Sequence, residues 1–313
     1  MKLVIQIPCL NEAETLPLVL KTIPKKITGI SEIVVLVIDD GSTDATVAVA
    51  RAHGVRHFVH HPQKQGLGRS FHDGVMYALD IGADVVVNTD GDNQYPQERI
   101  GDLVQPILNG EADIVVADRQ TSSIAHFSLF KKLLQRFGSR VVNIAAGTNI
   151  PDAPSGFRAY SKESLLRLNT ITRFSYTMES IIQAGNKGIG IVSIPVVTNP
   201  KLRESRLFSS TWEHVRKSGI TIVRGYIMYK PYMVFGTLAI ILFVLGAIPF
   251  TRFVVLSIQE DSTQGRIQSL IAGTVLLIGS FLCMVLNIIA DLIRINRILI
   301  EDNLEQTKRL RFK

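Results

Sequence analysis

The sequence is poor in cysteine, with only Cys9 and Cys283 in 313 residues. They lie far apart in apolar segments, which excludes a disulfide framework and the ligand spacing of a zinc site. A reducing, cytosol-facing location is therefore expected. Internal repeats, low-complexity runs and a Gly/Ser-rich linker are also absent, so the amino-terminal part is predicted to form one domain.

Two further patterns are missing near the start of the chain. The first predicted strand is followed by Pro8-Cys9-Leu10-Asn11 instead of G-x-G-x-x-G, which argues against a dinucleotide-binding oxidoreductase. The apolar start, Met1–Ile5, is interrupted by Pro8 and Asn11 and is too short for the apolar core of a cleavable signal sequence. No signal peptide is expected.

The net charge of +7 is concentrated in two short segments. Residues 1–200 carry 19 basic and 19 acidic side chains, and residues 231–290 carry two of each. The excess lies in residues 201–230, with seven basic against two acidic, and in residues 291–313, with six against four. A basic surface for nucleic acid is therefore not expected. The two basic segments flank the most apolar part of the chain.

That apolar part contains two uncharged stretches, Tyr232–Phe250 and Ser269–Ala290. Each has the length of about 20 residues that crosses a hydrocarbon core of ~30 Å. A polar connection, residues 257–268, would turn the chain back at the opposite face. Two buried core helices are the alternative, but the basic flanks favour a transmembrane hairpin. By the positive-inside rule, the protein is predicted to be a multi-pass protein of the inner (cytoplasmic) membrane, with the bulk of the chain in the cytosol.

Residues 1–200 alternate β-branched runs with amphipathic segments, the pattern of a mostly parallel sheet covered by helices. Strands are predicted at Leu3–Ile7, Ile33–Ile38, Arg56–Val59, Asp84–Asn88, Asp113–Ala117 and Ile189–Pro195. Helices are predicted at Glu12–Thr22, Asp44–His53, Gly68–Leu79, Gln97–Leu108, Leu129–Ala146, Lys162–Leu168 and Thr177–Asn186.

The segment before the apolar hairpin, residues 209–230, has the pattern of a basic interfacial helix. Its apolar residues recur at helical spacing among histidine, lysine and arginine: Trp212, Val215, Ile220, Val223 and Ile227. Such a helix is expected to lie on the bilayer surface, with packing against the domain as the alternative. The chain is thus divided into residues 1–207, a catalytic domain; 208–230, the interfacial helix; 231–293, the hairpin; and 294–313, a basic cytosolic tail.

Polar motifs follow the first two predicted strands. Asn11 is expected to cap the following helix, with Glu12 in its first turn. The second strand runs into Asp39-Asp40-Gly41-Ser42-Thr43-Asp44, which puts two carboxylates where ligands of open α/β sheets bind. A plain turn and helix cap explains Ser42 to Asp44 equally well.

The fourth strand leads into Thr89-Asp90-Gly91-Asp92-Asn93-Gln94. If this segment is extended, Asp90 and Asp92 point to the same side. Two carboxylates on one side suit Mg²⁺ or Mn²⁺, whose coordination is completed by water and substrate phosphates. Because a bare D-x-D also occurs in ordinary turns, the metal site depends on the strand context.

Five motifs occur in an order and at a spacing that resemble glycosyltransferase family 2, within it the dolichyl-phosphate mannose synthase and bacterial polyprenyl-phosphate glycosyltransferase group. They are P-C-L-N-E from Pro8, V-I-D-D-G-S-T-D from Val37, D-G-D-N-Q-Y-P from Asp90, S-G-F-R-A from Ser155 and R-E-S-R-L from Arg203. The resemblance covers nearly the whole chain and implies a Rossmann-like α/β domain of the glycosyltransferase-A type. The chain departs from the family at Glu204, where glycine is common, and at Gly91 and Asn93, where D-A-D-L-Q is usual.

The resemblance implies a role for each group of site residues. Those lining the nucleotide pocket would be Pro8, Asn11, Glu12, Asp39 and Asp40, and those holding the metal would be Asp90, Asp92 and Gln94. Arg119, Arg136 and Arg203 look like the family's lipid-phosphate ligands, with Lys132 or Arg140 as substitutes for Arg136. Asp152 is a candidate base if the acceptor is a sugar hydroxyl, although a turn residue is equally compatible with its position.

The expected reaction is a metal-dependent, inverting transfer of a sugar from a nucleotide diphosphate sugar to polyprenyl phosphate. UDP-glucose is the favoured donor and GDP-mannose the alternative. A processive polysaccharide synthase is disfavoured because Q-x-x-R-W is absent around Trp212. A non-catalytic membrane scaffold that retains the fold is the alternative from another class. A homo-oligomer is compatible with the small residues Gly273, Gly279 and Ser280 in the second span.

Overall fold

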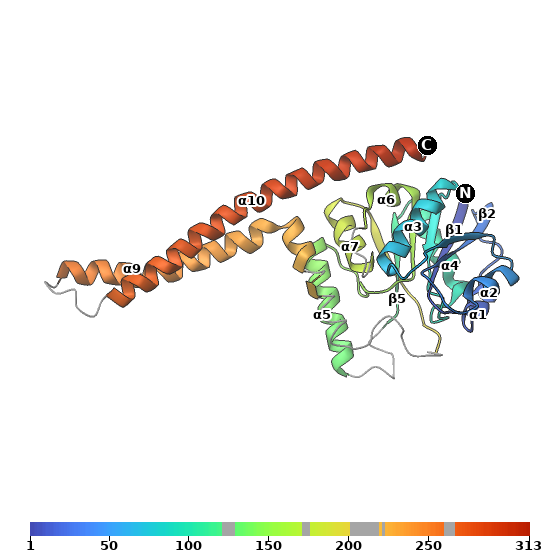
Figure 1. Ribbon diagram of the computed structural model, residues 1–313, viewed down its shortest axis with the longest axis horizontal. Coiled ribbons are helices and arrows are strands. Elements are labelled where there is room, and N and C mark those ends of the chain that lie inside the picture. The colour runs from blue at the N-terminus through green and yellow to red at the C-terminus, as the bar shows by residue number, and fades with distance from the viewer. Residues whose placement is uncertain (121–128, 171–175, 201–218, 221–222, 260–266) are drawn as a thin grey trace. The chain divides into compact units, whose positions relative to one another are not determined.

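The computed structural model describes residues 1–313 except 121–128, 171–175, 201–218, 221–222 and 260–266 (Figure 1). In these described parts the amino-terminal part of the chain contains a seven-stranded sheet of order β3-β2-β1-β4-β6-β5-β7. Its strands are β1 (Lys2–Cys9), β2 (Glu32–Asp39), β3 (His57–His60), β4 (Val85–Asn88), β5 (Ile114–Asp118), β6 (Arg158–Ser161) and β7 (Ile191–Pro195). β6 runs antiparallel to β4 and β5, and the other pairs are parallel. The mostly parallel α/β architecture expected from the sequence is confirmed.

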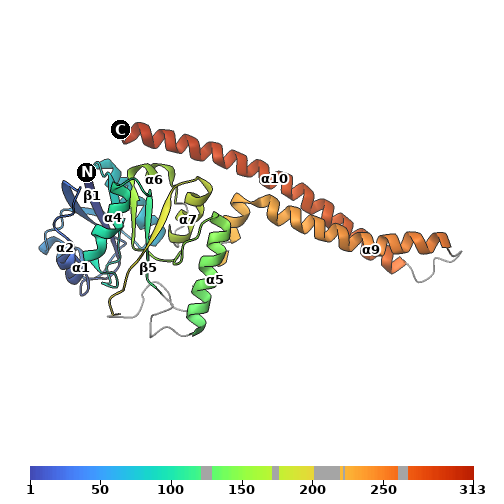
Figure 2. The same cartoon turned by 180° about the vertical axis from the view of Figure 1, so that it is seen from behind.

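The helices alternate with the strands along the chain (Figures 1 and 2). They are α1 (Leu16–Thr22), α2 (Thr46–Ala52), α3 (Leu67–Asp80), α4 (Ile100–Leu108), α5 (Leu129–Ala146), α6 (Lys162–Arg167) and α7 (Tyr176–Asn186), with a 3-10 turn, η1 (Gln97–Arg99), before α4. The apolar carboxyl-terminal part contains the π-helical turn η2 (Tyr232–Gly236), α9 (Thr237–Gln259) and α10 (Ile267–Arg311).

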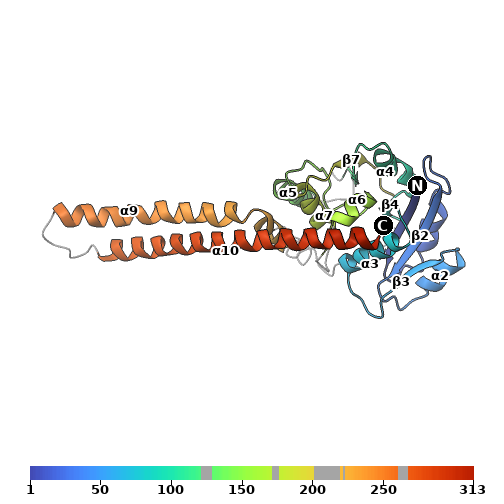
Figure 3. The ribbon, with the colours of Figure 1, turned by 90° about the horizontal axis from the view of Figure 1, so that it is seen from above.

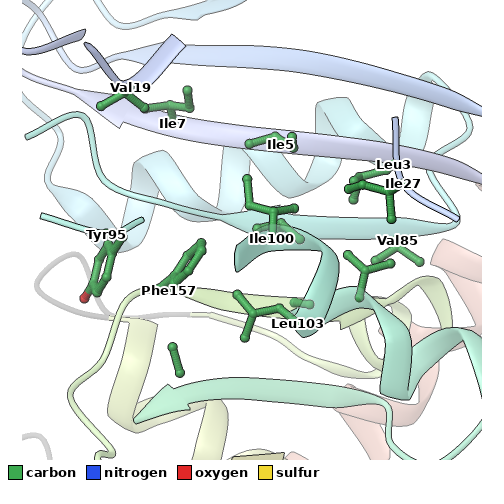
Figure 4. Packing of buried hydrophobic residues seen from close by; sticks show 14 of the residues in the cluster. Leu3, Ile5, Ile7, Val19, Ile27, Val85, Tyr95, Ile100, Leu103 and Phe157 are labelled. Carbon is green, nitrogen blue, oxygen red and sulfur yellow. The ribbon is translucent and has the colours of Figure 1, made fainter. Parts of the chain in front are cut away.

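The alternation of side chains along β1 determines which helix covers which face of the sheet. Leu3, Ile5 and Ile7 are fully buried on the face covered by Ile100 and Leu103 of α4 (Figure 4). On the opposite face α3 approaches the sheet at Gly74. A Cβ there would lie 2.5 Å from Gln6 Oε1 and 2.9 Å from Ile38 Cδ1, so any other residue would force the helix outward.

The strand directions gather the loops that carry the predicted motifs. β1, β2, β4 and β5 are parallel, so their carboxyl ends meet at one edge of the sheet. Because β6 runs in the opposite direction, its amino end lies at that same edge, with Arg158 opposite Asn88. The turn that precedes β6 is thereby brought beside the loops that follow β1, β2 and β4.

The chain divides into two compact units, Met1–Val223 with Asn303–Lys313, and Arg224–Asp302. The end of α10 belongs to the first unit. There Lys308 Nζ donates to the carbonyl of Leu168 at 2.6 Å, and Arg311 pairs with Asp80 at 2.9 Å. The four-part division predicted from the sequence stays a prediction.

In the second unit α9 and α10 run side by side (Figure 3). Among the described residues, two helices are long and apolar enough to cross a membrane, Tyr232–Ile258 and Ile267–Arg311, with mean hydropathies of 2.5 and 2.3 in their most apolar 18-residue windows. Most of their large apolar side chains are exposed. At 45 residues, α10 is about 67 Å long, roughly twice the thickness of a hydrocarbon core.

The small residues of the second span pack inside this helix pair. A Cβ on Gly273 would lie 2.9 Å from the backbone nitrogen of Phe250, and Ser280 Oγ donates to the carbonyl of Ala239 at 2.8 Å. At Gly279 the nearest atom of α9 would be 3.6 Å from the added Cβ. All three small residues therefore face α9 of the same chain. A homo-oligomer stays a prediction, but these small residues no longer support it because they contact α9 of the same chain.

Several predicted boundaries differ from those of the structure. α1 begins at Leu16, four residues after the predicted start, and α10 continues far beyond Ala290. The strand β6 was not predicted. Residues 219–220 and 223–229 of the predicted interfacial helix are helical and Lys230 is not, while residues 208–218 and 221–222 lie outside the described residues.

Candidate active site

The loops after β1 and β2 are joined by hydrogen bonds at the carboxyl edge of the sheet. Pro8 lies on β1 opposite Ile38 of β2. Beyond it, the Asn11 N–H donates to Ser42 Oγ at 2.9 Å, and Asn11 Oδ1 accepts the Thr43 N–H at 2.8 Å. The expectation that Asn11 caps α1 is therefore wrong. Asn11 adopts a φ of 58° and binds the neighbouring loop, because the parallel pairing of β1 and β2 supplies a donor that the local sequence does not reveal.

Glu12 lies between this loop and the one that follows β4. It is 8% exposed, and its carboxylate accepts a hydrogen bond from Thr15 Oγ1 at 2.7 Å. Thr15 Oγ1 is also 2.8 Å from the Gly91 carbonyl. The first motif is thus held against the D-G-D segment through a hydroxyl that the sequence analysis did not single out.

Asp39 and Asp40 are buried and organise the loop after β3. Asp39 accepts the Ser42 N–H at 3.0 Å and contacts His60 Nδ1 at 2.7 Å. Asp40 accepts the backbone N–H groups of Gln65 and Gly66 at 2.8 and 2.9 Å, and one of its oxygens lies 2.8 Å from His61 Nδ1. Both carboxylates therefore stabilise the backbone of the loops that follow β2 and β3. Sequence reasoning did not assign a role to this β3 loop, and its only local signals were the His60-His61-Pro62 run and the glycine at Gly66.

Asp90, Asp92 and Gln94 lie in a turn that begins after β4 ends at Asn88. The expected extended geometry is wrong, since the segment bends at once and Asn93 adopts a φ of 60°. Gln94 donates to both oxygens of Asp92, from its backbone N–H at 3.1 Å and from Nε2 at 2.7 Å. A Cβ on Gly91 would lie 3.1 Å from Cys9 Sγ, so glycine is what lets the turn approach β1.

The turn nevertheless brings two carboxylates into strong interaction. Burial raises the pKa of Asp90 to about 7, and the charges of Asp92 and Glu12 add to this, while Arg119 opposes it. Burial and the two neighbouring carboxylates outweigh Arg119, so additional positive charge would stabilise the ionised Asp90 carboxylate. A divalent cation would supply that charge, so the donor set fits Mg²⁺ or Mn²⁺. Within the described ranges no cluster of three or more His, Cys, Asp or Glu side chains forms a metal site, so substrate phosphates and water would have to complete the coordination.

Arg119 and Asp152 form a paired unit beside these carboxylates. Arg119 donates from Nε at 2.7 Å, from Nη2 at 2.9 Å and from its backbone N–H at 3.1 Å to the two oxygens of Asp152. Asp152 is 2% exposed. Arg119 follows β5 and Asp152 precedes β6, so the antiparallel pairing of these strands brings the two residues together although 33 positions separate them.

Arg136 lies on an exposed face of α5. It lines an open groove of about 530 Å³ together with Arg140, Asn143 and the segment from Gly147 to Pro151. Pro151 directly precedes Asp152 in the chain, but neither Asp152 nor Arg119 lines the groove. Both Arg136 and its substitute Arg140 lie in this groove. Lys132 and Arg203 belong to the parts whose side chains the structure does not describe.

The sequence analysis also missed a buried polar network that lies next to Asp90. It consists of Asn88, Tyr95, Tyr176 and the Gly156 peptide, which exchange hydrogen bonds of 2.6 to 3.0 Å. Burial raises the pKa of Tyr95 to about 12, so its hydroxyl stays neutral. Tyr95 and Gly156 lie inside motifs that the sequence analysis quoted, but no role was assigned to them because their partners come from strands and helices distant in the chain.

Comparison with known proteins gives a family and a fold. The model of the family described as "Glycosyl transferase family 2" matches residues 4–168. An undecaprenyl-phosphate mannosyltransferase of Micrococcus luteus is 28% identical over 66% of this chain and 88% of its own. A polyprenol monophosphomannose synthase of Mycolicibacterium smegmatis is 26% identical over 65% of this chain and 80% of its own.

A solved structure supports the fold. Glucosyl-3-phosphoglycerate synthase of Mycobacterium tuberculosis, crystallised with Mn²⁺, UDP-glucose and phosphoglyceric acid, aligns with a TM-score of 0.55 at 21% identity. The alignment covers 72% of this chain and 78% of that one.

Proposed function

The chain belongs to glycosyl transferase family 2, and we propose that it transfers a hexose from a nucleotide diphosphate sugar, with a divalent metal, to a polyprenyl phosphate in the membrane. The observation that carries the proposal is the juxtaposition of the Asp90–Asp92 carboxylates with the Arg119 guanidinium at one edge of the sheet. The names of two relatives, for mannose transfer to undecaprenyl phosphate and for polyprenol monophosphomannose synthesis, support the acceptor class.

The acceptor chemistry explains why carboxylates and arginines are needed together. A lipid phosphate monoester has a second pKa near 6, so at neutral pH it is mostly a dianion that attacks the anomeric carbon without a general base. Bringing this dianion beside a donor diphosphate is strongly repulsive. Arg119 lowers that repulsion from the acceptor side, and a metal held by Asp90, Asp92 and Gln94 would neutralise the donor diphosphate. A single displacement of this kind inverts the anomeric configuration.

The nucleotide is assigned to the loops after β1 and β2. Pro8, Asn11 and Glu12 would form one wall, and Asp39 and Asp40 the other. The two aspartates shape that wall through the β3 loop, because their oxygens already accept backbone N–H groups. We therefore propose that Asp39 and Asp40 support nucleotide binding by fixing the positions of these loops. Direct contacts with the base or ribose would add to this effect.

For Asp152 we propose a holding role. Its two oxygens accept three hydrogen bonds from Arg119, so proton abstraction would require the ion pair to break first. A phosphate acceptor needs no base, which makes this arrangement consistent with the proposed acceptor. Asp152 then holds the Arg119 guanidinium by its Nε and Nη2 atoms, and the Nη1 side would face the acceptor phosphate. Arg136 and Arg140 would add positive charge along the groove, and Arg203 is assigned to the same phosphate from its motif alone.

The donor has two candidates. UDP-glucose is favoured by the resemblance of the sequence, and the two relatives named for mannose transfer support GDP-mannose. We propose that α9 and α10 cross the inner membrane and that the catalytic unit lies in the cytosol, so that the site is held at the plane where the lipid headgroup is found.

The test is transfer of radiolabelled sugar into organic-extractable lipid by membranes that contain the protein. UDP-glucose, GDP-mannose and UDP-N-acetylglucosamine are compared with Mg²⁺, with Mn²⁺ and with chelator. Label in the lipid fraction that depends on metal and disappears in Asp92→Asn supports the reaction and identifies the donor. The exposed variant Asp102→Asn removes a carboxylate outside the site and should keep full activity.

The scaffold alternative makes a different prediction. A protein that kept the fold without activity should bind nucleotide without metal dependence and label no lipid. If no donor labels lipid while nucleotide binding still requires metal, the acceptor assignment is wrong, and a hydroxyl acceptor with Asp152 as base becomes the hypothesis to test.

A further inference from the structure

The Gly156 peptide is clamped on both sides by buried side chains. Its N–H donates to the Tyr95 hydroxyl at 3.0 Å. Its carbonyl accepts from Asn88 Nδ2 and from the Tyr176 hydroxyl, both at 3.0 Å. The peptide group is therefore fixed by three side chains that come from β4, the turn after it and α7.

Each tyrosine is held by an aromatic neighbour. Tyr176 stacks on Phe71 of α3 with ring centroids 3.9 Å apart and an interplanar angle of 1°. Tyr95 stacks on Phe157 with centroids 5.0 Å apart, as Figure 4 shows. Both rings are almost completely buried, at 0% and 4% exposure. Removing either hydroxyl would leave the ring in place, so the hydrogen bonds can be tested separately from the packing.

The clamped peptide forms a wall against Asp90. A Cβ added to Gly156 would lie 3.5 Å from both carboxylate oxygens of Asp90 and 3.3 Å from the Tyr176 hydroxyl. The Asp90 carboxylate thus rests on the Gly156 backbone. A shift of that backbone by a few tenths of an ångström changes the space in which the carboxylate is held.

The turn that contains Gly156 is also held by the buried guanidinium of Arg158. Arg158 is 0% exposed and donates to the carbonyls of Ala153 at 2.6 Å, Ser155 at 2.7 Å and Thr177 at 2.8 Å. It also donates to Ser180 Oγ at 2.9 Å, so its partners lie in the segment just before Gly156 and in α7. Arg158 therefore fixes the segment just before Gly156, and the position of the Gly156 peptide itself depends on Tyr95, Tyr176 and Asn88.

We propose that Tyr95 and Tyr176 are positioning residues for the metal site, because they fix the Gly156 peptide against which the Asp90 carboxylate is placed. The inference rests on the proposed function, in which Asp90 and Asp92 hold the divalent metal. In this role Tyr95 and Tyr176 act through the Gly156 peptide and do not bind the substrate or the metal themselves. The S-G-F-R motif, which contains Gly156, supports Asp90.

The two tyrosines should not contribute equally. In Tyr95→Phe the Gly156 N–H loses the one acceptor it has among the described residues, and an orphaned buried donor favours a displaced backbone. In Tyr176→Phe the Gly156 carbonyl keeps the bond from Asn88, so the wall is weakened less. Residues that hold metal ligands in place typically change metal affinity by about 10- to 100-fold. A loss of about 10-fold is expected for Tyr95→Phe and a smaller loss for Tyr176→Phe.

The matched control is Tyr160→Phe. Tyr160 is 0% exposed and lies next to Phe71, with ring centroids 5.5 Å apart, and its hydroxyl has no hydrogen-bond partner among the described residues. This variant therefore deletes a buried hydroxyl from the same core without touching the clamp. Its metal affinity should equal that of the unchanged protein.

The experiment measures Mn²⁺ binding to the full-length protein in detergent, from the paramagnetic resonance signal of free Mn²⁺, with UDP-glucose or GDP-mannose present. Thermal unfolding of each metal-free variant is measured in parallel. The inference is supported if Mn²⁺ affinity falls in the order Tyr160→Phe, Tyr176→Phe, Tyr95→Phe while excess Mn²⁺ restores transfer. A purely structural role would lower the unfolding temperature and leave the Mn²⁺ affinity of the folded fraction unchanged.

Failure of the inference is separable from failure of the proposed function. If the unchanged protein binds Mn²⁺ and Asp92→Asn does not, while both tyrosine variants bind like Tyr160→Phe, the positioning role is refuted and the metal site stands. If the unchanged protein does not bind Mn²⁺ with either nucleotide sugar, both ideas are overturned. Tyr176→Phe keeps the test decisive if Tyr95→Phe fails to fold.

Discussion

The raised pKa of Asp90 predicts that metal binding releases a proton in the neutral range. With a pKa of about 7, set by burial and by the Asp92 and Glu12 charges, Asp90 holds its proton in the metal-free protein at pH 6 and has lost it at pH 8. A metal ligand must be deprotonated, so about 0.9 proton should be released at pH 6, about 0.5 at pH 7 and about 0.1 at pH 8. The apparent metal affinity should rise about 10-fold from pH 6 to pH 8.

The assay is titration calorimetry of Mn²⁺ into the protein in buffers of different ionisation enthalpy. UDP-glucose is the right nucleotide for it, since its diphosphate is esterified at both ends and does not titrate near neutral pH. The exposed variant Asp102→Asn should give the same proton count. A count that stays constant between pH 6 and pH 8 would refute the reasoning, because a proton released from Asp90 must become a smaller count as pH rises through about 7.

The same shift has a consequence for stability without metal. A raised pKa means that the folded state holds the proton more tightly than the unfolded chain, so this stabilisation is lost as pH rises through about 7. From pH 6 to pH 8 the loss is about 1.4 kcal/mol for one group. The metal-free protein should therefore unfold at a lower temperature at pH 8 than at pH 6, and Asp90→Asn should reduce that difference.

Three further predictions follow from contacts elsewhere in the chain. Arg119→Lys cannot keep the bidentate pair with Asp152 and should lower kcat/KM for the lipid acceptor roughly 100-fold, whereas rates within two-fold of normal would exclude an acceptor role. Asn199→Ala removes the 3.1 Å bond from Nδ2 to the Asn93 carbonyl and should raise the metal concentration for half-maximal activity about 10-fold, with kcat restored at excess metal. Gly273→Ala would place a Cβ 2.9 Å from backbone and should cost about 1 to 3 kcal/mol in hairpin stability, seen as earlier unfolding in detergent, while Gly279→Ala should cost less.

The parallel strands could be predicted because their residues carry a local signal. β-branched runs marked β1, β2, β4 and β5 to within one or two residues of their ends, and most residues of each strand are apolar and most are buried. β6 was missed because Arg-Ala-Tyr-Ser has neither alternation nor β-branched residues. Its position depends on pairing with β4 and β5 and on a buried hydrogen bond from Arg158 to the Thr177 carbonyl, 19 residues away in sequence.

The site residues could be selected from the sequence, but their geometry could not. Asp90 and Asp92 do interact, yet they do so through a turn with Asn93 at positive φ and not through extended backbone. Asn11 looked like a helix cap because the helix was the only partner visible in the local sequence. Its actual partner, Thr43, is brought close by strand pairing, which sequence periodicity does not specify. The pairing of Arg119 with Asp152 required the unpredicted strand.

The antiparallel pairing of β5 and β6 also leaves the connection between these two strands free to vary in length. The chain leaves the sheet after Asp118 and returns at Arg158 on the adjacent strand, so the whole excursion is topologically a single long hairpin connection. Its two ends are neighbours whatever its length, and lengthening such a connection costs little closure entropy. The part of this connection that contains Arg119, Arg136 and Asp152 can therefore vary in length as long as the turn at Gly156, which contacts Asn88 and Tyr95, is kept. Under the proposed function, contacts to the acceptor could then change while the Gly156 turn keeps Asp90 in place.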